Sequence, residues 1–495
     1  MLPWSFAAPS CRPVSGRVLP WLVLWSAMTT ALVTAGQPTH PPDQQSRRPN
    51  ILFVLADDQR HDVLGCAGDP LLQTPVIDSL AGRGTRFTRA FVTTSICAAS
   101  RASFLSGRYE RSHGYTFGQR PMAGNVVDHA WPLRLRQAGY RTGLVGKFGV
   151  ATAPDATDRW FDRFQPLTRT PYWKQLDDGT KRHVTDITAD RAIEFLANSP
   201  GDQPFCLQVC FNAAHAEDHD LLDHYPWPPA ADHLYQSTVF PEPSLNDPAT
   251  LAAHPAFLMN SLNRQRFFWR WDTPDKYQKN IRGYYRMLSG MDHAIGRILA
   301  ALDERGLSGN TIVVFASDNG YYMGNRGFAG KWSHYDESLR IPLIVCDPRL
   351  SQQDRRPLAD GLVLNVDVPA TLLDWAGVAA PDSYQGRSFR PLLSGDPPAD
   401  WRTDFFCEHL MQIGDKIPKW EGVRSGRYMY ARYFEQDPAY EFLHDLQDDP
   451  DQTVNLARED VVPGELLERM RTRCDELRDD LGGPWSAERF PRRDR

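Results

Sequence analysis

Residues 49–58 read Pro-Asn-Ile-Leu-Phe-Val-Leu-Ala-Asp-Asp, and this stretch decides the fold class. Its apolar run shows no polar alternation, which is typical of a central strand in a parallel sheet that is covered on both faces. Similar runs at residues 140–145, 204–211 and 311–316 are separated by helical patterns such as that of residues 185–197. We therefore expect an α/β domain with a large, mostly parallel sheet flanked by helices.

Polar side chains follow the ends of these expected strands. Because the carboxyl ends of parallel strands meet at one edge of a sheet, we expect these side chains to lie together. Three carboxylates and an amide oxygen suit a hard divalent cation, whereas lysine and histidine suit a tetrahedral oxyanion. Each residue alone is also compatible with a solvated turn or a structural role. The residues that follow the strand ends are Asp57, Asp58, Lys147, His215, Asp318 and Asn319. Lys331, from a later loop, completes the candidate site.

A second segment of interest is residues 95–107, where Cys97 and Arg101 begin an expected short helix among small residues. The unpaired N–H groups and the dipole of a helix N-terminus suit an anion, and Arg101 lies one turn further on the same face. The alternative is a buried cysteine on an ordinary helix.

Composition and the N-terminus bear on location and partners. The net charge of −6 over 495 residues gives no reason to expect nucleic acid as a partner. Arg12 and Arg17 precede an apolar run at residues 18–33. We therefore expect a signal peptide at 1–36 and a polar tail at 37–48, hence an exported protein, periplasmic or secreted, without stable membrane contact. An uncleaved anchor is the alternative.

The remaining chain divides into two expected parts. Residues 49–395 form the large domain, which an irregular insertion at 216–280 interrupts, and residues 400–482 form a smaller α+β subdomain with an antiparallel sheet. Rings in the insertion either stack on a flat substrate or pack the insertion's own core. They are Trp227, Tyr235, Phe267, Phe268, Trp269 and Trp271.

The cysteines give no metal or scaffold pattern. Cys206 and Cys210 lie in an apolar, strand-like run and are expected in the core. One or two disulfides among the other cysteines remain open, since an exported protein permits them.

Taken together, the motifs resemble those of the type I sulfatases of the alkaline-phosphatase superfamily over residues 48–457. The Cys97-x-x-x-Arg101 signature is the most specific, and its third position is Ala99, where many members have proline. The other matching stretches are Arg48-Pro49-Asn50-Ile51 through Asp57-Asp58-Gln59, Ser106-Gly107-Arg108, Gly146-Lys147, Ala214-His215, Ser317-Asp318-Asn319-Gly320, Lys331 with residues 335–342, and Asp445-Leu446 to Asn455-Leu456.

The resemblance implies an alkaline-phosphatase-like fold and a sulfatase catalytic domain. It further implies that a formylglycine-generating enzyme converts Cys97 to formylglycine, whose hydrated form attacks a sulfate ester at sulfur. The implied ligands of a Ca²⁺ ion, or alternatively Mg²⁺, are Asp57, Asp58, modified Cys97, Asp318 and Asn319.

Roles for the cationic residues also follow from the resemblance. Arg101 and Lys147 would orient the hydrated aldehyde, while His215 and Lys331 would contact the sulfate, one of them as general acid.

The chain departs from the family at Gly149, where many members have a histidine that helps to break down the sulfated intermediate. His61 and His334 are candidate replacements.

Three functions follow from this interpretation. The first is a sulfatase acting on a sulfated small molecule or glycan, with carbohydrate favoured by the rings of the insertion. The second is a phosphodiester or phosphonate hydrolase of the same superfamily. The third is a non-catalytic binder of sulfated glycans, with Gly149 as a first loss.

Overall fold

The apolar strands of the sequence pair into one eight-stranded sheet in the computed structural model, which describes residues 48–411, 416–458 and 464–486. The predicted signal peptide and nearly all of the polar tail lie outside these ranges, so both stay predictions. Within these ranges, no helix combines the length and apolar character needed to cross a membrane.

The sheet is mostly parallel, as predicted. The five strands from β9 to β5 run parallel, whereas β12 is antiparallel to both of its neighbours, β9 and β2. In spatial order the strands are β13 (Leu358–Ala359), β2 (Thr85–Phe87), β12 (Leu343–Cys346), β9 (Thr311–Ser317), β1 (Asn50–Ala56), β8 (Phe205–Cys210), β4 (Arg141–Gly146) and β5 (Arg163–Pro166).

The register of this sheet aligns the carboxyl ends of its central strands. Ala56 of β1 lies opposite Ser317 of β9, and Cys210 of β8 lies opposite both Leu55 and Gly146. The residues that follow β1, β9, β8 and β4 therefore start from one edge of the sheet.

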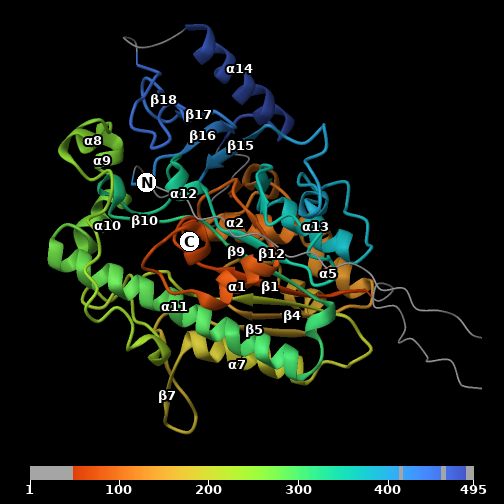
Figure 1. Cartoon of the computed structure of the whole chain (residues 1–495). Helices are drawn as coiled ribbons and strands as arrows, with labels where there is room; N and C mark the ends of the chain where they lie inside the picture. The colour runs from red at the N-terminus through yellow and green to blue at the C-terminus, as the bar shows by residue number, and fades with distance from the viewer. Residues whose placement is uncertain (1–47, 412–415, 459–463, 487–495) are drawn as a thin grey trace, which may run out of the picture. The chain divides into compact units, whose positions relative to one another are not determined.

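Helices cover both faces of the sheet, as Figure 1 shows for α7 and α11 on one side and α5 and α13 on the other. Alternate residues of β1 divide between the two cores: Ile51, Phe53 and Leu55 face one, Leu52 and Val54 the other. The first core includes α2 (Cys97–Ser106), α5 (Trp131–Gln137) and α13 (Asp367–Trp375); the second includes α1 (Pro75–Arg83), α7 (Val184–Ala197) and α11 (Pro274–Glu304).

The insertion at residues 216–280 is less irregular than predicted. It contains the short helices α8 (Pro248–Ala252), α9 (Ala256–Met259) and α10 (Leu262–Arg270), and α11 begins inside it. Helices of four to nine residues offer too few turns for an apolar period to stand out in the sequence, which explains the error.

The predicted C-terminal antiparallel sheet is confirmed. It consists of β15 (Asp404–His409), β16 (Trp420–Ser425), β17 (Tyr428–Tyr433) and β18 (Tyr440–Asp445), with α14 (Gly464–Asp480) packed on it. The predicted domain boundary at residues 395–400 stays a prediction.

This sheet supports two segments of the larger domain. Glu408 N donates a hydrogen bond to Thr93 O over 2.9 Å, and Trp420 Nε1 donates to Trp332 O over 2.7 Å. The sheet therefore fixes the backbone that enters Cys97 and the backbone that leaves Lys331.

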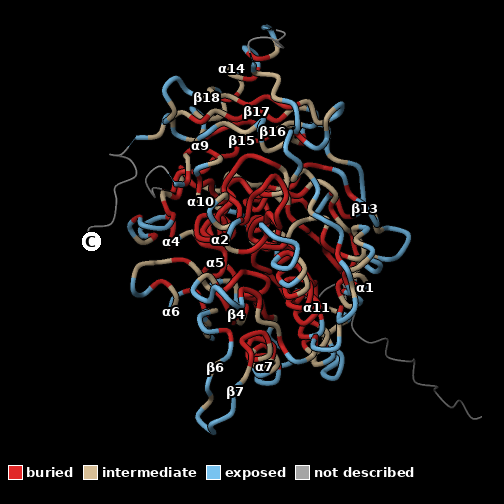
Figure 2. The backbone as a smooth tube through the Cα atoms, turned by 90° about the vertical axis from the view of Figure 1, so that its left-hand side faces the viewer, coloured by how far each residue is buried: buried red, intermediate tan, exposed pale blue. Residues whose placement is uncertain are grey.

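Shorter elements complete the described ranges, and among them the β6–β7 hairpin stands out as exposed in Figure 2. They are β3 (Ala90–Phe91), α3 (Glu110–His113), α4 (Asn125–Asp128), α6 (Ala156–Trp160), β6 (Trp173–Gln175), β7 (Lys181–His183), β10 (Tyr322–Met323), β11 (Ala329–Gly330), α12 (Asp336–Leu339) and β14 (Val363–Leu364).

The seven cysteines of the described ranges are free thiols in this structure. Cys206 and Cys210 are fully buried on β8, which confirms their predicted place in the core.

Candidate active site

Two buried carboxylates stand at the end of β1. Asp58 has a left-handed backbone, with φ of 59°, which aspartate adopts more readily than most residues. Asp57 N donates to Ala213 O over 2.9 Å, and Ala214 N donates to Asp57 O over 2.7 Å. These two bonds tie the end of β1 to the segment that leads to His215.

The residues after β9 join this acid pair. Asp58 N donates to Asp318 Oδ1 over 3.3 Å, and Asn319 Nδ2 donates to Asp58 Oδ1 over 2.6 Å. All four side chains are buried. The structure thus brings together Asp57, Asp58, Asp318 and Asn319, which the sequence placed at neighbouring strand ends.

Three buried cations face these acids. Arg101 donates from Nε to Asp318 Oδ2 over 2.7 Å, and the ammonium groups of Lys147 and Lys331 donate to Asp57 and Asp58. Buried charges need such partners, because an unpaired one would lose several kcal/mol of hydration.

Glycine at position 146 makes the position of Lys147 possible. Its φ is 94°, and a Cβ atom there would lie 1.9 Å from Cys210 O. Lys147 N donates to that same oxygen over 2.8 Å, so the chain leaves β4 in close contact with β8.

The charges act on the pKa values of the acids in opposite directions. Burial opposes the ionisation of Asp57, but the positive charges of Lys147, Arg101 and Lys331 outweigh it and lower its pKa. Burial, together with the negative charge of Asp57, raises the pKa of Asp318 to about 6. Asp57 therefore loses its proton more readily than Asp318, although both carboxyl groups are buried in the same cluster.

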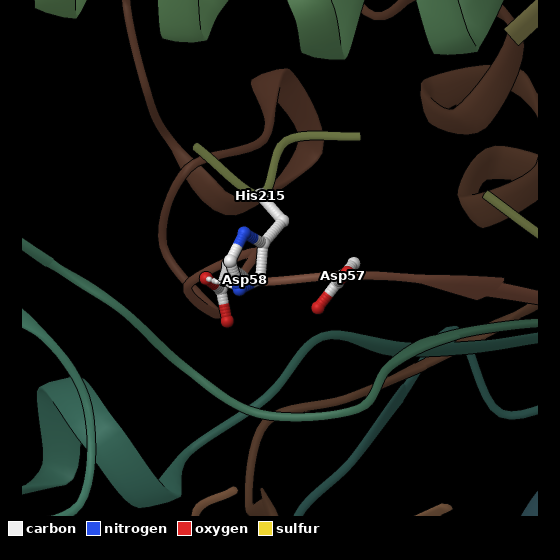
Figure 3. Close-up of side chains that lie close together, drawn as sticks. All are labelled: Asp57, Asp58 and His215. Carbon is white, nitrogen blue, oxygen red and sulfur yellow. Dashed lines mark ion pairs between the residues drawn. The ribbon is translucent and has the colours of Figure 1, made fainter. Parts of the chain in front are cut away.

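His215 faces the acid pair, as Figure 3 shows. Its Nε2 lies 3.7 Å from Asp58 Oδ2, and its Nδ1 lies 2.8 Å from Ala216 O. A carbonyl oxygen only accepts hydrogen bonds, so Nδ1 carries a proton. Burial lowers the pKa of His215 well below its usual value, and the charges of Arg169 and Lys331 lower it further. The ring is therefore neutral, with the Nε2 lone pair towards the acids.

Cys97 opens onto the same space from the first position of α2. A pocket of about 390 Å³ is lined by Cys97, Lys147, His215 and Lys331. Arg101 lies one turn along the buried helix and donates from Nη1 to Lys147 O over 2.8 Å. Lys147, His215 and Lys331 thus line one pocket with Cys97, and Arg101 binds Lys147 without lining it.

Two oxygen atoms of the acid cluster have the character of free metal ligands. Asp57 Oδ1 and Asn319 Oδ1 are buried and make no hydrogen bond within the part of the chain that the structure describes. Asp57, Asp58 and His215 also bring ligand atoms within 4.8 Å of one another. Oxygen donors of this kind fit a hard divalent cation.

None of the six aromatic rings of the insertion lines the pocket, so the structure does not support the substrate platform, which was one of the two alternatives for them. Tyr235, Phe267 and Trp271 are buried in the core beside α11, and Phe268 is exposed outside the pocket. These three buried rings pack into the core that the insertion shares with the sheet and α11, rather than into a core of the insertion alone. The aromatic residues that line the pocket are Phe117, Phe148 and Trp332, of which Trp332 directly follows Lys331.

Neither candidate replacement for the missing histidine lies in the pocket. His334 contacts Tyr433 OH over 3.0 Å and His444 Nε2 over 3.3 Å, while His61 lies beside Asp62. Gly149 itself has a φ of 73°, and a Cβ atom there would lie 3.0 Å from Arg101 Cδ. The backbone at this position is therefore built for glycine.

Sequence reasoning also missed part of the pocket wall. Arg169, Asp218 and Arg266 line it, but they come from loops and a short helix without a recognisable motif. Only their three-dimensional grouping shows that they belong together.

Comparison with known proteins places the chain in a family. A sequence model of the sulfatase family matches residues 49–378, and one of the C-terminal region of N-sulphoglucosamine sulphohydrolase matches residues 324–480. An N-acetylglucosamine-6-O-sulfatase of Bacteroides thetaiotaomicron is 28% identical over 489 residues, which cover 84% of this chain and 84% of the relative.

Solved structures agree. One, in complex with its substrate D-glucosamine-2-N,6-O-disulfate, has a TM-score of 0.74 and 25% identity, covering 88% of this chain and 98% of its own. A phosphonate monoester hydrolase from Silicibacter pomeroyi has a TM-score of 0.72 at 23% identity, covers 88% of this chain and 96% of its own, and shares the fold alone. The chain belongs to the sulfatase family of the alkaline-phosphatase superfamily and is a sulfuric ester hydrolase.

Proposed function

We propose that the protein removes a sulfate ester from a glucosamine-type carbohydrate. The proposal rests on one pocket, which Cys97, Lys147, His215 and Lys331 line. The two lysines bind the buried Asp57 and Asp58, and Arg101 binds Asp318 beside them. Such a pocket suits a tetrahedral oxyanion next to a nucleophile. The sugar comes from the relatives, of which one is an N-acetylglucosamine-6-O-sulfatase and one is solved with a sulfated glucosamine.

The reaction requires two groups that the family implies. A formylglycine-generating enzyme would convert Cys97, and Asp57, Asp58, Asp318 and Asn319 would hold Ca²⁺ or Mg²⁺ with it. The unpartnered oxygens of Asp57 and Asn319 fit that ion. These groups supply a hydrated aldehyde oxygen, activated by a cation, for attack on sulfur.

The chain's own residues position the reacting groups. Arg101 uses Nε and Nη1 for Asp318 and Lys147, which leaves a buried Nη2 with no partner in the described ranges. That N–H group is free to orient the modified Cys97. Lys147, in the pocket beside Asp57, offsets negative charge there.

Lys331 is the general acid in this proposal. The neutral ring of His215 holds its proton on Nδ1 against Ala216 O, so Nε2 has no proton to give to the leaving alcohol. Lys331 has three N–H bonds and faces the same pocket. His215 then contacts the substrate and orients it.

The signal sequence predicted at residues 1–36 adds a location to this proposal. Export would place the enzyme in the periplasm or outside the cell, where it meets sulfated glycans.

A phosphorus ester is the second candidate substrate. The fold of a phosphonate monoester hydrolase is similar, and a cationic pocket also accepts phosphorus oxyanions. The sulfatase family match over residues 49–378 favours sulfate.

A substrate screen tests the proposal. We expect the purified enzyme to release sulfate from N-acetylglucosamine 6-sulfate with higher kcat/KM than from aryl sulfates of similar size, because the pocket binds the sugar as well as the sulfate. Ion chromatography of the released sulfate measures kcat/KM for the sugar sulfate and for the aryl sulfates. Turnover confined to aryl sulfates or to phosphonate esters would refute the sugar proposal.

The ion can be tested by metal analysis. We expect about one Ca²⁺ or Mg²⁺ per chain in the wild type and much less in Asp318→Asn, because the variant removes one oxygen anion from the cluster. Asp178→Asn, in the exposed turn of the β6–β7 hairpin, serves as the control and should keep the ion. Equal metal content in all three proteins would contradict the assignment.

The acid role predicts a leaving-group effect. Lys331→Met should lower kcat by about 100- to 10,000-fold on a sugar sulfate but much less on an aryl sulfate, whose phenolate leaves without protonation. His215→Gln should lower both rates to a similar extent. A steeper leaving-group dependence in His215→Gln than in Lys331→Met would transfer the role to His215.

A further inference from the structure

Two arginines that have no role in the proposed reaction line one wall of the active-site pocket. Arg169, between β5 and β6, and Arg266, on α10, both line the pocket and both bind Asp218. Arg169 Nη2 donates to Asp218 Oδ2 over 3.1 Å, and Arg266 Nη2 donates to the same oxygen over 3.0 Å.

A third arginine holds Asp218 from behind. Arg270 is fully buried, does not line the pocket, donates to Asp218 Oδ1, and reaches Tyr321 OH over 3.2 Å. Asp218 therefore faces three guanidinium groups, of which it can neutralise one. The neighbouring Glu217 accepts from Thr170 Oγ1 over 3.0 Å and is not bonded to these arginines.

The two arginines of the wall keep N–H groups available. Arg266 donates to the described residues from Nη2, which leaves its Nη1 without an acceptor among them. Arg169 donates from Nε, to Ala216 O over 3.1 Å, and from Nη2, so its Nη1 also has no acceptor in the part of the chain that the structure describes. The side chain of Arg266 is 15% exposed and that of Arg169 is 25% exposed. Salt would therefore screen their attraction for a bound anion only weakly.

These N–H groups lie close to the reaction centre but are distinct from it. The Arg266 guanidinium stacks on the Trp332 ring at 5.0 Å, and Trp332 directly follows Lys331. The charge of Arg169 is also the strongest electrostatic influence that lowers the pKa of His215, after burial. A group bound by the wall can thus belong to the same molecule as the reacting sulfate.

Buried guanidinium groups favour a ligand that brings negative charge and planar or tetrahedral oxygen acceptors. A neutral sugar substituent would leave part of this positive charge unpaired. An anionic second substituent would pair with that charge, so a wall of this kind would distinguish sulfated sugars by their second substituent.

We infer that Arg169 and Arg266 form a second anion subsite, and that the preferred substrate carries a second sulfate or carboxylate group near the ester that is cleaved. This inference rests on the proposed function, since it adds to a sulfated glucosamine substrate the requirement for a second negative charge.

The test compares matched substrates. We expect kcat/KM for glucosamine-2-N,6-O-disulfate to exceed that for N-acetylglucosamine 6-sulfate by about 10- to 100-fold, the effect of one charge-assisted hydrogen bond. A 6-sulfated glucosamine linked to a uronic acid tests a carboxylate as the second group. The preference should shrink as salt is added, because screening weakens the extra contact.

Variants locate the effect. Arg169→Gln and Arg266→Gln should each lower the preference ratio, mainly through KM, and Arg266→Lys should restore part of it. Arg264→Gln is the matched control, because Arg264 lies on the same helix, bonds Gly327 O and does not line the pocket. Equal kcat/KM for the matched substrates in the wild type, or an unchanged ratio in both variants, would overturn the subsite.

A different result would refute the proposed function rather than the anion subsite. If the wild type cleaves neither sugar but cleaves aryl sulfates, the sugar proposal fails. Phenyl sulfate and its carboxyphenyl counterpart then decide on the subsite. A preference for the carboxylated ester that is lost in Arg266→Gln supports it, and equal rates refute it.

Discussion

The balance of charge at the carboxyl edge of the sheet is the constraint on which the site depends. Asp57, Asp58 and Asp318 are buried there, and each is bound by a buried cation. Neither set could be buried alone, because each isolated charge would lose its hydration without compensation. The proposed function uses the same groups: the carboxylates would hold a cation, and the lysines would contact a sulfate.

The register of the parallel strands, rather than any one local sequence motif, brings these groups together. β1, β9, β8 and β4 end level with one another, so four separate segments contribute to one site. Close packing at this edge leaves room only for glycine at position 146, where β4 meets Cys210 O. The C-terminal sheet adds support from outside, through Thr93 and Trp332.

The sequence predicts the parallel sheet and the grouping of the acids because both follow from continuous apolar strands with polar residues at their ends. Cys97 and Arg101 are predictable because their spacing resembles the family signature, whereas the stretch alone also fits a buried cysteine on an ordinary helix. The wall of Arg169 and Arg266 is not, because its members are far apart in the chain and meet only around Asp218. The place of the aromatic rings of the insertion could not be predicted for a related reason. Composition alone does not distinguish a ring that is buried in the core, such as Trp271, from a ring that lines a pocket.

The absence of a histidine at position 149 does not make the protein a mere binder of sulfated glycans. The rest of the site is in place around Cys97, and Gly149 has a left-handed backbone that favours glycine, where a Cβ atom would lie 3.0 Å from Arg101 Cδ. The family match also identifies the chain as an enzyme. We propose that the step which the resemblance assigns to that histidine uses water or another base in this protein.

We propose that Cys97 is the precursor of the nucleophile rather than a thiol nucleophile itself. Mass analysis of the peptide that contains Cys97, taken from protein made in its native host, tests this most directly. Conversion to formylglycine removes the thiol sulfur, so we predict a lighter peptide that reacts with aldehyde reagents, in proportion to the sulfatase activity of the sample. A peptide that retains the unmodified thiol in fully active protein would contradict the account.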